Sequence, residues 1–146
     1  MDPGLMLIRI LRAPLPSRLR RLDWGRSLDW AQYARARRGF VPLSPADKWF
    51  VACNRGTFSF HRSGNGILVY RVNFVYRDEV FAARETLVND DPLQITPLPE
   101  SYETLFLDYL FDILLLGRKR PFPALPGTDP ALAPLVERIW MGRAAD

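Results

Sequence analysis

Four runs of alternating residues joined by short turns constrain the fold of this chain more than any other feature of its sequence. The runs cover Lys48–Cys53, Thr57–Arg62, Ile67–Arg77 and Val80–Val88. The third run has the clearest period of two, and its apolar side chains share one face: Leu68, Tyr70, Val72, Phe74 and Tyr76. Because parallel strands need crossovers of roughly a dozen residues, these short turns predict an antiparallel meander of four strands.

A strongly apolar segment after the meander predicts a buried helix from about Glu100 to Leu116, ended by Gly117. Its polar residues form only a narrow stripe of Thr104, Asp108 and Asp112. A helix that is apolar around most of its circumference is buried on several sides. We therefore expect an α+β fold in which a four-stranded antiparallel meander packs against this buried C-terminal helix.

The acidic pair on this helix has two interpretations. Asp108 and Asp112 lie four residues apart, and paired carboxylates bind a metal or share acid–base chemistry. In the second interpretation they are simply the only solvated stripe of a buried helix, or they pair with Arg71 or Arg84 from the sheet. The second interpretation is favoured, and no metal is expected. The basic run at residues 118–120 then complements the negative end of the helix.

The N-terminal segment is predicted to be a basic, Arg-rich helical extension. Residues 1–40 contain nine arginines and three aspartates, for a net charge of +6. The remainder has eleven basic and thirteen acidic residues, for a net charge of −2. Residues 27–38 predict a helix with Ser27 as its N-cap. A basic arm binds phosphate or an acidic partner, although an ordinary solvated arginine-rich face is the favoured interpretation.

A last helix is predicted near the C-terminus. Asp129 is its N-cap, Pro130 is its first residue, and Gly142 ends it. Its apolar residues recur at helical spacing: Leu132, Leu135, Val136, Ile139 and Trp140. The sequence thus predicts a helical extension over residues 1–44 and a single α+β domain over residues 45–146, with helices flanking the meander on both sides.

Several classes of protein are disfavoured by composition. The single cysteine, Cys53, cannot form an internal disulfide. One cysteine and one histidine also argue against a zinc site, which needs about four such ligands. No apolar stretch reaches the ~18 residues of a membrane span. The start, MDPGLMLIRIL, is a poor signal peptide. These features predict a cytoplasmic protein without a membrane segment, and no cofactor is expected.

His61, Arg62 and Ser63, at the end of the second strand, are the first candidates for chemistry. A histidine beside an arginine holds a phosphate or acts as a base, and the glycine-rich turn at residues 63–66 presents backbone N–H groups to an anion. No nucleotide-binding fingerprint accompanies them. The structural alternative is a histidine hydrogen-bonded into the fold with Arg62 paired to an acid. A nucleophilic triad is not predicted from one histidine.

Three segments together resemble a known family: DKWFVACNRGTFSFHRSGNGILVYRVNF at 47–74, ETLVNDDP at 85–92 and FDILLLG at 111–117. They resemble a small bacterial domain with the pattern KWF, HRSxTG, IYxVxF, VNRDP and LLLG. That domain occurs alone or beside ADP-ribosylglycohydrolase and macro-type modules. His61, Arg62 and Ser63 match the HRS element, and Asn89 matches the loop, while Gly64, Asn65 and Asp90 depart from the pattern. The resemblance implies a link to ADP-ribose or NAD chemistry.

Three functions remain open, in order of preference. The first is a non-catalytic interaction protein, immunity-like or accessory, that docks on a toxin or enzyme through Trp24, Trp30 or Trp140 as interface anchors. The second is an ADP-ribose or nucleotide site, with or without hydrolase activity. Its candidate ligand-binding residues are His61, Arg62, Ser63, Arg71, Glu85 and Asn89, with Arg62 clamping phosphate and Glu85 as a base. The third is nucleic-acid binding through the basic arm.

Overall fold

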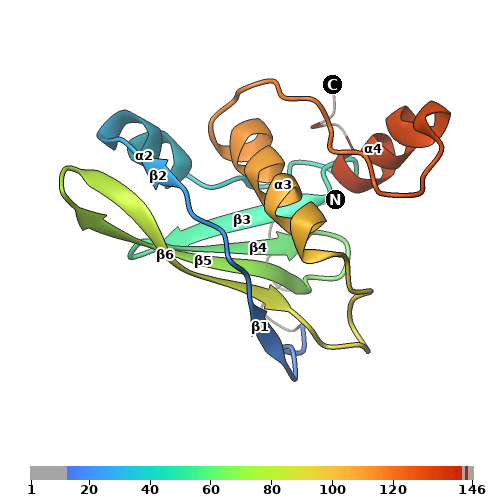
Figure 1. Cartoon of the computed structure of the whole chain (residues 1–146), viewed down its shortest axis with the longest axis horizontal. Helices are drawn as coiled ribbons and strands as arrows, with labels where there is room; N and C mark the ends of the chain where they lie inside the picture. The colour runs from blue at the N-terminus through green and yellow to red at the C-terminus, as the bar shows by residue number, and fades with distance from the viewer. Residues whose placement is uncertain (1–12, 143, 145–146) are drawn as a thin grey trace.

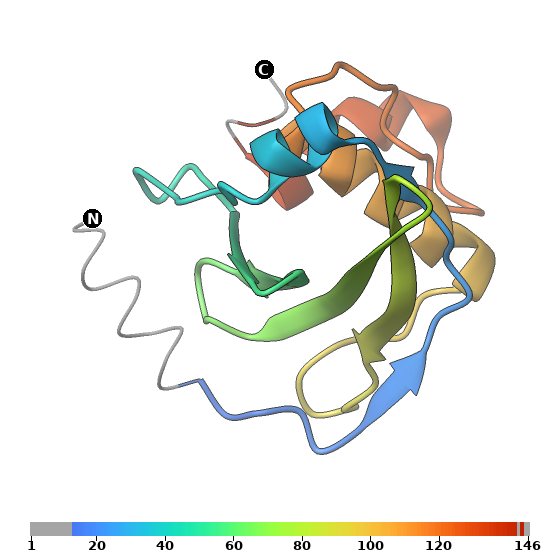
Figure 2. The ribbon, with the colours of Figure 1, turned by 90° about the vertical axis from the view of Figure 1, so that its left-hand side faces the viewer.

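The computed structural model describes residues 13–142 and 144, so Arg9 and Arg12 of the predicted basic arm lie outside the described residues. The fold is α+β. An antiparallel sheet has its helices on one side (Figure 1), and it is strongly curled when viewed along the perpendicular direction (Figure 2). Its strand order is β1-β6-β5-β4-β3, and β2 also pairs with β6.

The predicted meander is present, with strand bounds close to those expected. It comprises β3 (Trp49–Asn54), β4 (Thr57–Arg62), β5 (Leu68–Arg77) and β6 (Val80–Asn89), all paired antiparallel. The β5–β6 turn has positive φ at both Asp78 and Glu79, as a two-residue hairpin turn of the favoured twist requires. The strand positions predicted from the turn residues are therefore confirmed.

The sheet has six strands, and the predicted count of four was wrong. The N-terminal segment adds β1 (Leu19–Arg21) and β2 (Ser27–Leu28), which pair with β6 in the registers Arg20↔Val88 and Leu28↔Phe81. They cover the outer edge of β6, whose N–H and C=O groups would otherwise be unpaired. Strands of two and three residues are too short to show a period of two, so no pattern in the sequence indicates them.

Helix α2 (Trp30–Ala36) begins later than predicted. Ser27 lies in β2, and the N-cap is Asp29, whose side chain accepts a hydrogen bond from the backbone N–H of Gln32. The Gln32 side chain accepts one from the Asp29 N–H in return, which completes a capping box. Ser27 and Leu28, the first residues of the predicted helix, therefore form a strand that pairs with β6 instead.

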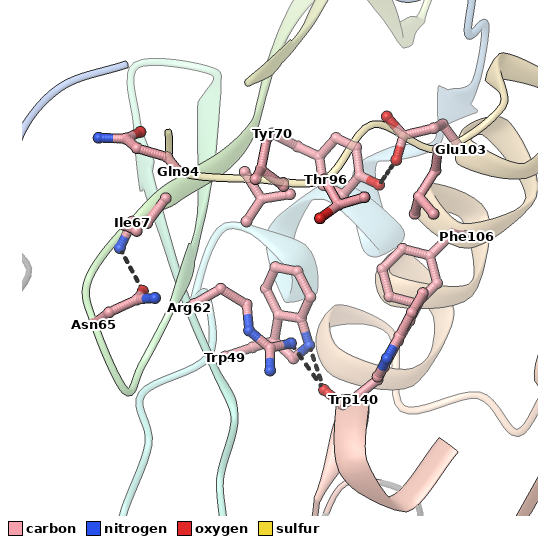
Figure 3. A pocket seen from close by; sticks show the side chains of 13 residues that line it. Trp49, Arg62, Asn65, Ile67, Tyr70, Gln94, Thr96, Glu103, Phe106 and Trp140 are labelled. Carbon is pink, nitrogen blue, oxygen red and sulfur yellow. Dashed lines mark hydrogen bonds between the residues drawn. The ribbon is translucent and has the colours of Figure 1, made fainter. Parts of the chain in front are cut away.

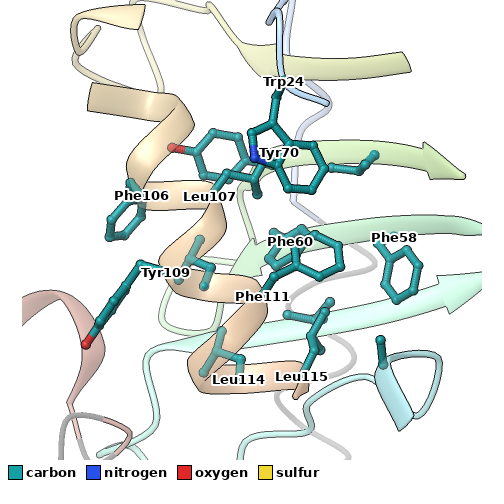
Figure 4. Close-up of a cluster of buried hydrophobic side chains, with 14 of the residues drawn as sticks. Trp24, Phe58, Phe60, Tyr70, Phe106, Leu107, Tyr109, Phe111, Leu114 and Leu115 are labelled. Atoms are coloured by element: carbon teal, nitrogen blue, oxygen red, sulfur yellow. The ribbon is translucent and has the colours of Figure 1, made fainter. Parts of the chain in front are cut away.

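The core lies between the sheet and α3 (Glu100–Leu110), which continues as a π-helical turn, η1 (Phe111–Leu115), and stops at Gly117 with φ 62°. We call the sheet face toward α3 the helix face, and the other the opposite face. Alternate strand residues are buried on the helix face: Val51, Phe58, Phe60, Tyr70 and Val72. They belong to the same core cluster as Phe106, Leu107, Leu110 and Phe111 of α3 and η1, and several of these side chains are drawn in Figure 4. The buried helix is thus confirmed as the central element.

The acidic stripe of α3 and η1 pairs with an arginine that was not expected. Arg26 Nη2 lies 2.6 Å from Asp112 Oδ1, and Arg26 Nη1 lies 3.2 Å from Asp108 Oδ1. Arg120 Nη1 binds the second Asp112 oxygen at 2.6 Å. The predicted partner, Arg71 or Arg84, was wrong, because the β1–β2 connection brings Arg26 over the helix. Among the described residues, no cluster of histidine, cysteine and carboxylates suits a metal ion.

The C-terminal helix follows its predicted caps. The Asp129 side chain accepts from the N–H of Ala131 at the start of η2 (Pro130–Leu132), α4 (Ala133–Met141) follows, and Gly142 ends it with φ 58°. Trp140 packs against Phe106 of α3 with ring centroids 5.2 Å apart. Three other residues of the predicted apolar stripe are 48–57% exposed: Leu132, Leu135 and Ile139. Within the described part of the chain, no helix is both long and apolar enough to cross a membrane.

Candidate ligand-binding pocket

His61 and Arg62 are neighbours in β4, so their side chains point to opposite faces of the sheet. Arg62 pairs in register with Trp49 on the helix face, whereas His61 pairs with Phe50 on the opposite face, with ring centroids 6.1 Å apart. The His61 Nδ1–H donates to the carbonyl of Gly66 at 3.1 Å. Burial lowers the pKa of His61 below 6.5, although the hydrogen bond to Gly66 acts to raise it. The two residues therefore do not form one site.

Ser63 and Asn89 are buried and hold the fold together. Ser63 Oγ donates to the backbone carbonyl of Asp47 at 2.5 Å. Asn89 Nδ2 donates to the Leu68 carbonyl at 2.7 Å and to Gln94 Oε1 at 2.8 Å, and its Oδ1 accepts from the Asp91 N–H at 2.8 Å. The hydrogen bonds of Asn89 connect the ends of β5 and β6 with each other and with the neighbouring turn, and that of Ser63 connects the turn after β4 with the segment before β3. Neither side chain is presented to a ligand.

Arg71 and Glu85 line a shallow hollow on the opposite face of the sheet. The hollow measures about 430 Å³, and its wall is formed by Thr57, Arg71, Asn73, Arg84, Glu85 and Leu87. Glu85 is in register with Asn73, two residues along β5 from Arg71. Since Arg62 faces the other way, Glu85 is not placed to act as a base beside it. The six predicted ligand-binding residues are thus divided between the two faces.

A second pocket, with a mainly apolar lining, opens on the helix face, between the ends of β3–β5, the loop before α3, and the helices α3 and α4. Its volume is about 420 Å³, within the range of small-molecule sites. We call it the Arg62 pocket (Figure 3). Its lining consists of Trp49, Arg62, Asn65, Ile67, Val69, Tyr70, Gln94, Ile95, Thr96, Leu98, Glu103, Phe106 and Trp140. Only Arg62 and Glu103 among these carry charge.

Arg62 is partly buried in the wall of this pocket. Its guanidinium carbon lies 4.9 Å from the centroid of the Trp49 ring, in cation–π geometry. Nη1 donates to the carbonyl of Trp140 at 3.1 Å, and Trp49 Nε1 donates to that same carbonyl at 3.0 Å (Figure 3). No carboxylate forms an ion pair with Arg62 among residues 13–142 and 144. Its remaining N–H donors are therefore available to an anion.

Glu103 forms the second charged part of the wall and is fully engaged. Its Oε1 accepts from the Tyr70 hydroxyl at 2.6 Å, and its Oε2 lies 2.6 Å from Arg20 Nη2. Burial raises the pKa of Glu103, while the hydrogen bonds from Tyr70 and Arg20 act in the other direction. Burial and the neighbouring Glu103 raise the pKa of Tyr70 well above its ordinary value. Both oxygens of this carboxylate therefore already have a partner within the fold.

The three predicted interface tryptophans occupy three different environments. Trp24 is 7% exposed, and it stacks on Phe111 with centroids 5.3 Å apart, so it belongs to the core. Trp30 is 57% exposed, and its Nε1 donates to the Tyr76 hydroxyl at 3.3 Å. Trp140 lines the Arg62 pocket. Of the three, only Trp30 and Trp140 offer surface to a partner.

Three of the seven described arginines of the basic arm form ion pairs within the fold, whereas Arg21, Arg35, Arg37 and Arg38 are exposed. Arg18 Nε lies 2.9 Å from Asp90 Oδ2, and Arg20 and Arg26 form the ion pairs with Glu103 and Asp112 given above. These contacts attach the N-terminal segment to α3, to η1 and to Asp90, the residue that follows β6. A cation that is already paired contributes less to the binding of phosphate.

Sequence reasoning missed the partners of Arg62 in this pocket. Counting outward from the Asn54–Thr57 hairpin pair would have placed Trp49 opposite Arg62, because the β3–β4 register is regular. Glu103 falls at helical spacing with Phe106 and Leu107 on the buried side of α3, which is an unusual place for a charge. Nothing in the sequence indicates that α4 closes the pocket with Trp140.

Comparison of the chain with protein-family models, with curated proteins and with solved structures finds no match.

Proposed function

We propose that this chain is a non-catalytic interaction protein that holds its partner at the Arg62 pocket. One observation carries the proposal: a partly buried guanidinium without a carboxylate partner among the described residues lines an apolar pocket of about 420 Å³. Desolvation of a charge is costly unless it is compensated. A partner that supplies an anion to Arg62 offsets that cost, and apolar contacts add to the affinity.

The separation of the reactive side chains supports a binding role over catalysis. His61 faces away from the pocket and donates to Gly66, while Ser63 Oγ donates to Asp47. The Cys53 thiol has its pKa raised by burial, which makes the nucleophilic thiolate scarcer at neutral pH. Nucleophilic catalysis needs a base within hydrogen-bond reach of the nucleophile. None of these three residues supplies that arrangement at Arg62.

A protein partner is favoured because the pocket adjoins an exposed apolar surface on α4. Trp140 forms a wall of the pocket, and the solvent side of η2 and α4 carries Leu132, Leu135 and Ile139, each about half exposed. Arginine and tryptophan are both enriched among interface hot spots. A toxin or an enzyme bound by an immunity-like or accessory protein is the kind of partner that we propose.

The test compares two substitutions on the same strand that point to opposite faces. Tagged wild-type protein, Arg62→Gln and His61→Gln are incubated with native lysate, and retained proteins are quantified by mass spectrometry. We expect one stoichiometric partner with the wild type and with His61→Gln, and its loss with Arg62→Gln. Equal retention by all three proteins would contradict the pocket as the docking site. Turnover of ADP-ribose by the wild type would contradict the non-catalytic role.

A further inference from the structure

The Arg62 pocket has one positive charge that nothing in the described fold neutralises. Glu103, the other charged residue of the lining, is paired with Arg20 at 2.6 Å. Two arginines and one glutamate therefore leave a single positive charge, and it resides on Arg62. A ligand that matches this pocket brings one negative charge.

The available donors of Arg62 favour a carboxylate as the carrier of that charge. The planar guanidinium matches a carboxylate in bidentate geometry, and within the described part of the chain its one hydrogen bond runs from Nη1 to the Trp140 carbonyl. A phosphate monoester carries about −1.5 to −2 charges at neutral pH, so it brings excess charge toward Glu103. A pyrophosphate such as that of ADP-ribose has the same disadvantage.

The rest of the pocket is shaped for an apolar body of limited size. Aromatic walls come from Trp49, Phe106 and Trp140, and Ile95 and Leu98 close the side formed by the loop before α3. Its volume of about 420 Å³ equals that of roughly 14 water molecules at ~30 Å³ each. This space suits a group of roughly a dozen non-hydrogen atoms, which is the size of one large side chain with its backbone.

We infer that the Arg62 pocket binds an apolar group that carries a single carboxylate, with the carboxylate on Arg62 and the apolar body against Phe106 and Trp140. The inference rests on the proposed function, because it names the chemical group by which the partner is held. Two sources share this chemistry. One is the C-terminal residue of a protein partner, and the other is a free organic acid.

The experiment compares matched acids and amides on the intact chain. The probes are 3-phenylpropionate and its amide, an N-acetylated tripeptide that ends in phenylalanine with a free or an amidated terminus, and ADP-ribose. Dissociation constants are measured by isothermal titration calorimetry at neutral pH. We expect each acid to bind at least about tenfold more tightly than its amide, the scale of a charge-assisted hydrogen bond. ADP-ribose should bind more weakly than either acid.

The variants locate the effect, and the acid–amide comparison on the wild type does not depend on them. Arg62→Gln should abolish the difference between acid and amide, and His61→Gln on the opposite face should preserve it. A tighter peptide acid assigns the carboxyl terminus of a protein, and a tighter 3-phenylpropionate assigns a free acid. Both outcomes support the inference.

Three results would overturn it. These are equal dissociation constants for acid and amide, tighter binding of ADP-ribose than of both acids, and no binding of either acid at millimolar concentration. Each leaves the proposed function standing if Arg62→Gln still loses the captured partner. Conversely, retention of the partner by Arg62→Gln refutes the proposed function, whatever the small probes do.

Discussion

Trp24 provides the sharpest test of the packing, because the sequence placed it among the interface anchors and the structure places it in the core. Its indole is 7% exposed, it stacks on Phe111, and its edge meets Phe74 with centroids 6.2 Å apart. Its Nε1 donates to Asp108 Oδ1 at 3.2 Å. We choose Trp24→Phe, which keeps a ring against Phe111, and Trp30→Phe as the matched exposed control.

The expected cost of Trp24→Phe has two parts. Loss of the hydrogen bond to the Asp108 carboxylate costs about 1.5–3 kcal/mol, and the lower end applies because Arg26 still binds that carboxylate. The smaller ring leaves a void worth about 1 kcal/mol, close to one buried methylene group. The free energy of unfolding should fall by about 2–3 kcal/mol. For Trp30→Phe we expect about 0.5 kcal/mol or less, since the side chain is 57% exposed.

Urea denaturation followed by far-UV circular dichroism measures both variants without relying on tryptophan fluorescence. With a slope of about 1.5 kcal/mol per molar urea, Trp24→Phe should lower the midpoint by roughly 1.3–2 M, and Trp30→Phe by roughly 0.3 M or less. Equal midpoints for the two variants would refute the placement of Trp24 in the core. A larger shift for Trp30→Phe would refute it as well.

Three further predictions concern stability. Burial opposes ionisation of Asp112, but Arg26 and Arg120 outweigh this effect, so the pKa of Asp112 lies below 3.8. The stability that the ionised carboxylate contributes is present above pH 3.8 and is lost as the pH falls through the folded pKa. Asp112→Asn should remove that loss of stability at acid pH in urea titrations. Burial raises the pKa of Glu103 above 4.5, so stability falls as the pH rises from 4.5 through the folded pKa, and Glu103→Gln should flatten that fall in the same titrations. Gly39 has φ 70°, and a Cβ there would collide with the Val51 carbonyl, so Gly39→Ala should cost more than about 1 kcal/mol in thermal denaturation. Gly64→Ala, which meets no atom within 4 Å, should change stability by about 0.5 kcal/mol or less.

The candidate site shows how a contiguous motif misleads in a strand. His61, Arg62 and Ser63 look like one constellation in the sequence, but His61 and Arg62 are successive strand residues and face opposite ways, while Ser63 lies in the turn after the strand. Only Arg62 reaches the pocket, where its neighbours come from β3, β5, α3 and α4. The alternation of side chains along a strand predicted the core correctly. Applied to the polar residues, it would have placed His61 and Arg62 on opposite faces of the sheet.

Local signals determined much of this fold from the sequence alone. The four long strands, the apolar helix of residues 100–116 and the C-terminal helix with its Asp129 cap all depend on periodicity and turn chemistry within a few residues. Such signals are local, because side-chain direction repeats every two residues in a strand and about every 3.6 in a helix. They survive in the sequence without knowledge of the partner surface.

Only the tertiary structure decided the features that depend on contacts between distant segments. The strands β1 and β2 exist because β6 offers them an edge, and Arg26 finds Asp112 because the connection between those strands crosses the buried helix. The Arg62 pocket likewise requires α4 to bring the backbone carbonyl of Trp140 within hydrogen-bond distance of Arg62, which is 78 residues away in the sequence. Each of these pairings forms between segments that are close in space but distant in the sequence. Such contacts leave no periodic pattern in the sequence.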